Sequence, residues 1–288
     1  MKARNFRYIR PKTLAEACQI LASADGEAVA LAGGQSLLAG LNMRLSSPRL
    51  LVDIADLKEL REQSHANGTV RLGALTRHAE LLSSELVRKH LPLLSKAAPH
   101  IGHVAIRNRG TLGGSLAYAD PAAELPACAV ALDATLVLAS SRGERKIRAE
   151  DFFKGLFETD LRPGELIAAV EFPAVQPGIV TGFAELSRRH GDFALAGLAV
   201  VAAVQGGRLE EARLVYIGCA DRPKVARAVS KAVAALRPPL ADFKAIEQAV
   251  MQDLSPEDIP GLRGDTRVRM ATVLTRRVLN GMLESVAA

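Results

Sequence analysis

The sequence predicts an α+β protein of two domains, and three observations support that prediction. A chain of 288 residues is longer than one typical domain and can bury a substantial core. Apolar segments with strand and helix patterns are mixed in both halves of the chain. Between the halves, Pro173 and the Pro177-Gly178 pair interrupt any regular element. We therefore expect one domain at 1–176 and a smaller α+β domain at 177–288.

The first domain opens with a small α/β arrangement. Thr13 and Glu16 have the spacing of a capping box, which predicts a helix through about Ser23. Short apolar strands are expected at 27–32 and 50–54, and the first runs directly into a glycine pair. The remaining expected elements of this domain are strands at 69–75, 134–139 and 165–172, helical segments within 78–100, and a helix at 123–132.

The second domain follows the pattern of a small sheet packed against helices. Apolar runs typical of strands come first, and amphipathic runs typical of helices follow. We expect strands at 179–186, 194–204 and 212–218, and helices at 223–236, 242–251 and 266–283.

Composition argues against several classes of protein. The net charge is +6, but lysines and arginines are scattered, aromatic residues make up 4% and tryptophan is absent, so we expect no nucleic-acid binding. The cysteines, Cys18, Cys128 and Cys219, are too far apart for a disulfide framework, a metal site or an iron–sulfur site built by this chain. The longest apolar stretch, 193–204, is too short to span a bilayer, and the N-terminus lacks an apolar signal segment. We expect a cytoplasmic protein without a membrane span.

Two glycine pairs are the features that point most directly to chemistry. Glycine has no Cβ, so backbone N–H groups can approach a ligand, and such loops form concave anion sites. A single loop of this kind is more often an ordinary tight turn. Two loops about eighty residues apart suit the two phosphates of a dinucleotide, with hydroxyl side chains adding hydrogen bonds. The first loop is Ala30-Leu31-Ala32-Gly33-Gly34-Gln35-Ser36-Leu37, and the second is Thr111-Leu112-Gly113-Gly114-Ser115.

Three better-known glycine motifs are absent. Neither loop reads G-x-G-x-x-G, and the chain contains no G-x-x-x-x-G-K-[ST], which excludes the nicotinamide-Rossmann and P-loop interpretations. Leu38 stands where a nucleophile elbow would have its final glycine, so Ser36 is not a predicted nucleophile.

Four segments together make the resemblance to a known family specific. They lie in order along the chain at 32–37 (AGGQSL), 107–115 (RNRGTLGGS), 119–126 (ADPAAELP) and 187–194 (SRRHGDFA). With them the chain resembles the medium, FAD-binding subunit of the xanthine dehydrogenase and carbon monoxide dehydrogenase family. The resemblance implies a vanillyl-alcohol-oxidase (PCMH)-type FAD-binding fold, with subdomains at about 1–56 and 57–176, followed by the C-terminal domain.

The same resemblance implies FAD as the cofactor and assigns residues to it. The first loop wraps the pyrophosphate, and Thr111 to Ser115 close on it from the other side. Glu124 takes the place of an acid that hydrogen-bonds the flavin's sugar-alcohol chain. Ile101 lies near the adenine and Ile167 near the ring system, and Phe193 lies beside the flavin. Relatives have His where this chain has Gln35, and carbon monoxide dehydrogenase-like members have Tyr in place of Phe193, so no hydroxyl is available there.

Several of these polar residues also have ordinary interpretations. Asp120, a further cofactor-binding candidate, and Glu124 are four residues apart and can share one face of a helix starting near Pro121. There they can equally complement the helix macrodipole. His100 and His103 lack further metal ligands and are expected to be ordinary surface histidines. Arg188-Arg189 is expected to be a solvated turn or a subunit contact rather than an anchor for an acidic partner or for the pyrophosphate.

The resemblance implies electron relay rather than substrate chemistry, with no catalytic side chain and no metal on this chain. Electrons would come from a large subunit carrying the molybdopterin cofactor, through a small subunit with two [2Fe-2S] clusters, and leave for an external acceptor. The expected assembly is a dimer of heterotrimers. Two alternatives stay open: a free-standing FAD-dependent oxidoreductase of the same fold, and a flavin-free scaffold. The first is disfavoured because no base or covalent-flavin His or Cys is expected beside the loops.

Overall fold

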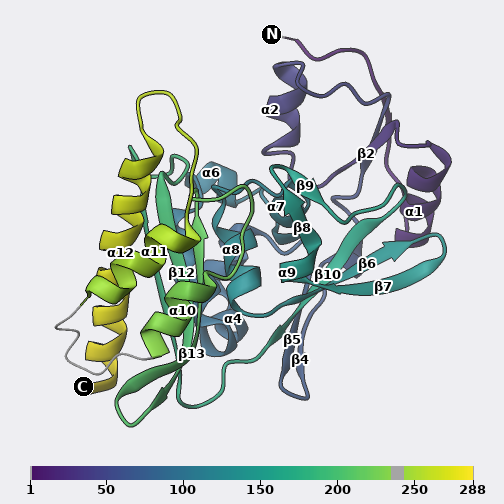
Figure 1. The fold of residues 1–288 in the computed structure, drawn as a ribbon. Coiled ribbons are helices and arrows are strands. Elements are labelled where there is room, and N and C mark those ends of the chain that lie inside the picture. The colour runs from purple at the N-terminus through teal and green to yellow at the C-terminus, as the bar shows by residue number, and fades with distance from the viewer. Residues whose placement is uncertain (1, 235–242, 288) are drawn as a thin grey trace.

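The computed structural model describes residues 2–234 and 243–287, and it contains three main sheets, each covered by helices (Figure 1). The N-terminal part lies at one end and the C-terminal helices at the other. Within the described residues, none of the helices combines the length and apolar character that crossing a membrane requires.

A small parallel sheet forms the N-terminal subdomain. Its strands run in the order β1-β3-β2, with both neighbouring pairs parallel. The predicted N-cap is present, because the Thr13 side chain accepts a hydrogen bond from the Glu16 backbone N–H at 3.1 Å. The capping box is incomplete, because the Glu16 carboxylate accepts from the Lys12 backbone N–H at 2.7 Å and not from that of Thr13. α2 is the short helix expected between the glycine pair and the second strand, whereas β1, of three residues, was not predicted. The elements are β1 (Arg7–Ile9), α1 (Leu14–Ser23), β2 (Ala28–Leu31), α2 (Leu37–Asn42) and β3 (Leu50–Asp53).

A five-stranded antiparallel sheet follows, in the order β4-β5-β10-β6-β7. The central strands match the predicted apolar runs. The edge strands β4 and β7 are polar, which is why the search for apolar periodicity missed them. The strands are β4 (Gln63–Ala66), β5 (Thr69–Gly73), β6 (Thr135–Ser140), β7 (Gly143–Arg148) and β10 (Leu166–Pro173), with η1 (Lys58–Leu60), α9 (Ala149–Phe152), β8 (Phe153–Gly155) and β9 (Glu158–Thr159) beside them.

Between β5 and β6 the chain forms short helices. The stretch predicted as helical from His78 to His100 is divided, because Ser84 caps a new helix and Pro92 begins another. The helices are α3 (His78–Ser83), α4 (Glu85–His90), α5 (Pro92–Ala97), η2 (Ala98–His100), α6 (Val104–Arg107), α7 (Leu112–Tyr118) and α8 (Glu124–Ala131).

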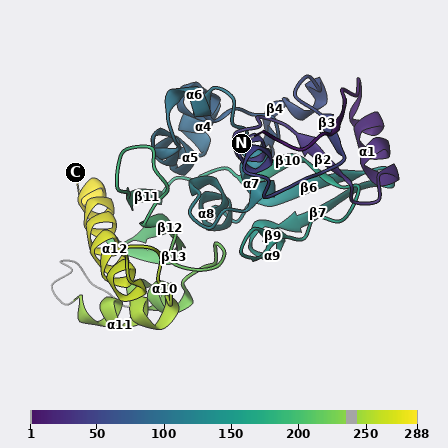
Figure 2. The ribbon, with the colours of Figure 1, turned by 90° about the horizontal axis from the view of Figure 1, so that it is seen from above.

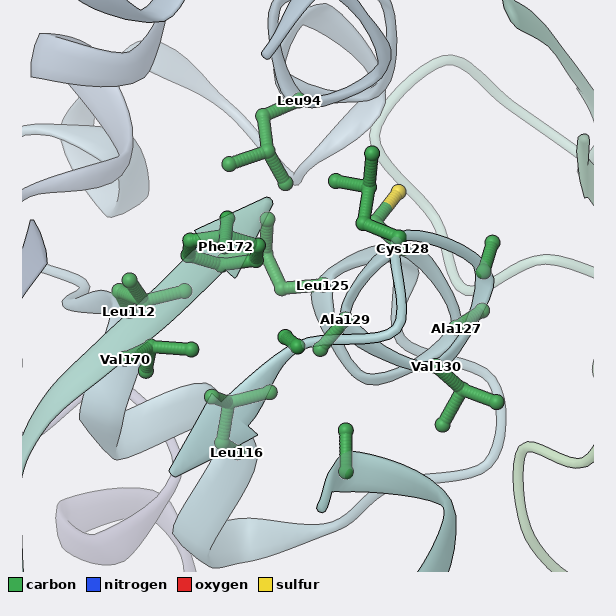
Figure 3. Packing of buried hydrophobic residues seen from close by; sticks show 14 of the residues in the cluster. Leu94, Leu112, Leu116, Leu125, Ala127, Cys128, Ala129, Val130, Val170 and Phe172 are labelled. Carbon is green, nitrogen blue, oxygen red and sulfur yellow. The ribbon is translucent and has the colours of Figure 1, made fainter. Parts of the chain in front are cut away.

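Helix α8 is the centre of the main core. Every residue of α8 is buried, including its first residue, Glu124. Leu125 and Cys128 face a cluster that includes Leu94 of α5 and Phe172 of β10 (Figure 3). An apolar helix enclosed on all sides holds its N-terminal end in a fixed position, and that end borders the site described below.

The C-terminal domain is an antiparallel sheet in the order β11-β12-β13, with helices on its outer face. Alternate residues of β12 enter two different cores. Ala199 packs with α8 in the main core, whereas Leu198 and Val200 pack with α12. The sheet therefore lies between α8 and α12 and joins the two domains (Figure 2). Its elements are β11 (Ile179–Leu186), β12 (Ala196–Gln205), β13 (Arg208–Ile217), α10 (Arg227–Ala234), α11 (Lys244–Asp253) and α12 (Gly264–Ala287).

Several predicted boundaries in this domain differ from the structure by a few residues. The strand expected from 194 begins at Ala196, after a loop. The helix expected from Pro223 begins at Arg227. Its expected end at Leu236, and the expected start of the next helix at Asp242, lie outside the described residues.

Candidate functional site

A cavity of about 610 Å³ lies where the first glycine loop, the second glycine loop, the start of α8 and the C-terminal domain meet. Its volume falls in the range of roughly 300–1,000 Å³ typical of small-molecule and cofactor sites. The segment 188–195, which joins β11 to β12, supplies the wall from the C-terminal domain. Gly191 holds this segment close, since a Cβ there would lie 2.8 Å from Cε1 of His103.

The glycine pair of the first loop follows β2. It packs directly against Arg109 and Gly110, the backbone that leads into the second glycine loop. A Cβ on Gly33 would lie 2.2 Å from the carbonyl oxygen of Arg109, so only glycine fits there. Gly34 has φ +71°, in the left-handed region. The Gln35 side-chain amide donates to the Gly33 carbonyl at 3.1 Å. Ser36 makes no capping hydrogen bond to α2, which leaves its hydroxyl available to a ligand.

The second glycine pair is the first turn of α7 rather than a separate turn. Thr111 is the N-cap, and its hydroxyl oxygen accepts from the Gly114 backbone N–H at 3.2 Å. Gly113 faces the protein, because its Cβ would lie 2.5 Å from Cβ of Ala74. Gly114 and Ser115 face the cavity. The backbone contact between Gly33 and Arg109 thus joins the two loops, and residues of both loops line the cavity.

The two predicted acids, Asp120 and Glu124, line the cavity, but they do not share a helix face as predicted. Helix α8 begins at Glu124, not near Pro121, because the Asp120 carboxylate accepts from the Ala122 backbone N–H at 2.9 Å and forms a turn first. Asp120 therefore precedes the helix and does not share its face with Glu124. Burial raises the pKa of Glu124 to about 8, and the charges of Glu185 and Asp120 add to the shift. Burial also raises the pKa of Asp120.

His78 lines the cavity as well, although no sequence motif indicates it. It is 6% exposed, and neither ring nitrogen has a hydrogen-bond partner within the described part of the chain. Burial lowers its pKa to about 4, a shift opposed by the Thr111 backbone and increased by the charge of Arg107. An unpartnered buried polar group costs roughly 1–3 kcal/mol. The expectation that neither a base nor a covalent-flavin His or Cys lies beside the loops did not anticipate this histidine.

All but four of the predicted residues line the cavity. Phe193 does so from the loop before β12, with 70% of its surface exposed, and so it is not a strand residue. The predicted residues that line the cavity are Ala30, Ala32, Gly33, Gly34, Gln35, Ser36, Leu37, Ile101, Thr111, Gly114, Ser115, Asp120, Glu124 and Phe193.

Four predicted residues lie outside the lining. Leu31 is in β2. Leu112 and Gly113 are the buried residues of the second loop and face the protein interior. Ile167 is 4% exposed within β10 and belongs to the main core. The register of β10 shifts between Ile167 and Ala169, which changes the faces that successive side chains occupy.

Comparison with known proteins assigns the chain to a family. Residues 4–175 match the family described as the FAD binding domain in molybdopterin dehydrogenase. Residues 181–282 match the CO dehydrogenase flavoprotein C-terminal domain. The chain belongs to the molybdopterin dehydrogenase flavoproteins. The predicted family and the predicted two-part fold are both confirmed.

Relatives resemble this flavoprotein over nearly their whole length. The 6-hydroxypseudooxynicotine dehydrogenase complex subunit alpha of Paenarthrobacter nicotinovorans is 38% identical, across 96% of this chain and 93% of that protein. The solved carbon monoxide dehydrogenase of Hydrogenophaga pseudoflava aligns with a TM-score of 0.94 and 33% identity, over 98% of each chain. Quinoline 2-oxidoreductase of Pseudomonas putida 86 aligns with a TM-score of 0.92 and 37% identity, over 100% of each chain.

The cavity of this flavoprotein fits FAD by its chemistry. The Gly33 contact leaves no room for a side chain between the loops, so the backbones of the two loops come close together beside the cavity, as a backbone cradle for a diphosphate requires. Ile101 and Ile106 offer apolar surface to a planar ring, and Phe193 offers an aromatic face. The unpartnered nitrogens of His78 are polar groups of the kind that a ligand satisfies.

Proposed function

We propose that this chain binds FAD in the cavity between the glycine loops and relays electrons for a multi-subunit molybdenum hydroxylase. When bound, FAD supplies the chemistry of accepting electrons and passing them on, and the protein supplies binding, orientation and electrostatics. The observation that carries the proposal is the backbone contact of Gly33 with Arg109, which brings two glycine loops together at one cavity.

Within this proposal the domain at 1–176 binds most of the cofactor, and the domain at 177–288 closes over it. The loop at 30–37 holds the diphosphate through its backbone N–H groups, and Thr111 and Ser115 add hydroxyl groups. The backbone N–H groups of residues 112–115 already have acceptors within the chain. Glu124, which carries its proton at neutral pH, offers an O–H donor as well as an acceptor to the sugar-alcohol chain. Phe193 covers the ring system from the C-terminal domain.

The proposed partners follow from the relatives. The carbon monoxide dehydrogenase chains are named medium chains, and the nicotine-derivative enzyme is named a complex, which supports a large molybdenum subunit and a small iron–sulfur subunit beside this chain. We infer a dimer of such heterotrimers and an external electron acceptor. The substrate pocket then belongs to the large subunit, so no side chain of this chain is assigned to substrate oxidation.

The first experiment is the visible spectrum of the purified chain, before and after FAD is added. Flavin bands, with FAD and not FMN released on denaturation, are the expected result. A colourless chain that takes up no FAD, alone or in its native complex, contradicts the proposal. Steady turnover of a reduced substrate by the isolated chain would favour the free-standing oxidoreductase instead, for which Glu124 and His78 in the cavity would be the candidate bases.

A further inference from the structure

His78 is a buried polar side chain with no partner at the edge of the cavity. It begins α3, and its backbone N–H donates to the Gly110 carbonyl at 3.0 Å. Its ring lies against Gly110, where a Cβ would be 2.8 Å from Cε1 and from Nδ1. The ring is thus fixed beside the backbone that leads into Thr111, and it also borders the cavity.

Local backbone pairing explains how the ring reaches this position. Arg77 forms an antiparallel bridge with Thr111, and the Leu112 backbone N–H donates to the Thr76 carbonyl at 2.8 Å. The segment 76–78 therefore runs along the segment 110–112 as a short ladder. Any movement of the second glycine loop would move His78 with it, so the two act on a ligand as one unit.

Burial keeps the imidazole neutral, because its pKa is lowered to about 4. A neutral imidazole has one N–H donor and one lone-pair acceptor. In the described residues neither nitrogen has a partner in hydrogen-bond geometry, although the Thr111 backbone lies close enough to oppose the pKa shift. Buried polar groups in folded proteins are almost always hydrogen-bonded. A ligand in the cavity is the partner that this arrangement lacks.

We propose that His78 is an FAD ligand, and that its N–H donates to the diphosphate–ribose part of the cofactor beside the second glycine loop. The inference rests on the proposed function, since it takes the cavity as the FAD site. It adds a residue that none of the four family segments contains. The remaining ring nitrogen is then free to accept from a ribose hydroxyl or an enclosed water.

The test is FAD affinity and stability of the full chain with His78→Phe. A phenyl ring keeps most of the shape and removes both unpartnered nitrogens. We expect the apo-protein to keep or raise its unfolding midpoint, while FAD binds at least tenfold more weakly. Riboflavin, which lacks the diphosphate and the adenosine, should bind equally to wild type and variant. His78→Gln, which retains a donor and an acceptor, should recover much of the FAD affinity.

A matched control is His65→Phe, at an exposed histidine of β4 outside the cavity, which should leave FAD affinity unchanged. The inference is overturned if His78→Phe and His78→Gln both bind FAD within twofold of wild type. It is also overturned if riboflavin and FAD weaken equally as apo stability falls, because that pattern indicates a packing role. If His78→Phe binds FAD normally while Gly33→Ala loses it, only this inference fails. If the wild-type chain binds no FAD, both this inference and the proposed function fail.

Discussion

Replacing Gly33 by alanine tests the backbone contact on which the FAD cradle depends. The new Cβ would lie 2.2 Å from the Arg109 carbonyl oxygen, 2.8 Å from its carbonyl carbon and 2.9 Å from Cα of Gly110. All three are backbone atoms, so no flexible side chain can move aside. Real Cβ atoms almost never lie closer than 3.0 Å to another heavy atom, so the loops would have to separate by about 0.8 Å to reach even that distance.

The expected magnitude follows from that separation. Overpacking of a well-packed interior costs typically about 1–3 kcal/mol, so the apo-protein should lose stability of that order. A hydrogen bond to a charged group contributes about 1.5–3 kcal/mol. If the displaced loop loses one such bond to the diphosphate, FAD affinity should fall roughly 10- to 100-fold.

Gly40→Ala is the matched control for this prediction. Gly40 lies in α2, beyond the same loop, and a Cβ there would meet nothing within 4 Å. Alanine in a helix interior is about 0.5–1 kcal/mol more favourable than glycine, so this variant should be at least as stable as wild type. Titration of the apo-proteins with FAD by flavin fluorescence, together with thermal unfolding, measures both effects. An affinity for Gly33→Ala within twofold of wild type would refute the reasoning.

Three further perturbations test other parts of the site and core. Because the pKa of Glu124 in the folded protein, about 8, exceeds its ordinary 4.5, folding takes up a proton, and the contribution of Glu124 to stability declines as pH rises from about 4.5 to 8. Glu124→Gln should therefore gain stability relative to wild type between pH 5 and pH 9 in urea unfolding; a constant difference would show that Glu124 is ionised throughout. Phe193→Tyr should change the rate of flavin reoxidation more than FAD affinity, because the exposed ring gains a hydroxyl without burial cost; an unchanged rate would remove Phe193 from the flavin. Phe172→Ala, in the fully buried core, should lower the free energy of unfolding by about 3–5 kcal/mol in guanidinium unfolding, and a loss below about 1 kcal/mol would contradict the packing.

Much of the cavity could be predicted from short sequence signals because those signals act locally. The glycine pairs mark backbone that must approach other backbone, and Gly33 and Gly113 do so. The N-caps at Thr111 and Thr13 likewise depend on residues three positions away. Such features need no knowledge of the rest of the fold.

What could not be predicted depends on contacts between distant segments. His78 reaches the cavity only because residues 76–78 pair with residues 110–112, and no local pattern encodes that ladder. Ile167 was assigned by family position, yet the register shift beside it leaves its side chain in the core. The start of α8 is different, because the Asp120-Pro121 pair is a recognisable turn signal and its hydrogen bond to Ala122 delays the helix.

The charges around the cavity explain why a glycine cradle is needed there. Of the described lining residues, Asp120, Glu124 and Asp192 bear carboxyl groups, whereas Arg188 alone bears a permanent positive charge. A diphosphate dianion bound there, as proposed, would meet few cations, so its charge would have to be met mainly by hydroxyl groups and by the backbone N–H groups of the first loop. The glycines of the first loop would then be an electrostatic as well as a steric requirement. The proton on Glu124 acts in the same direction, since it removes a negative charge from the same cavity at neutral pH.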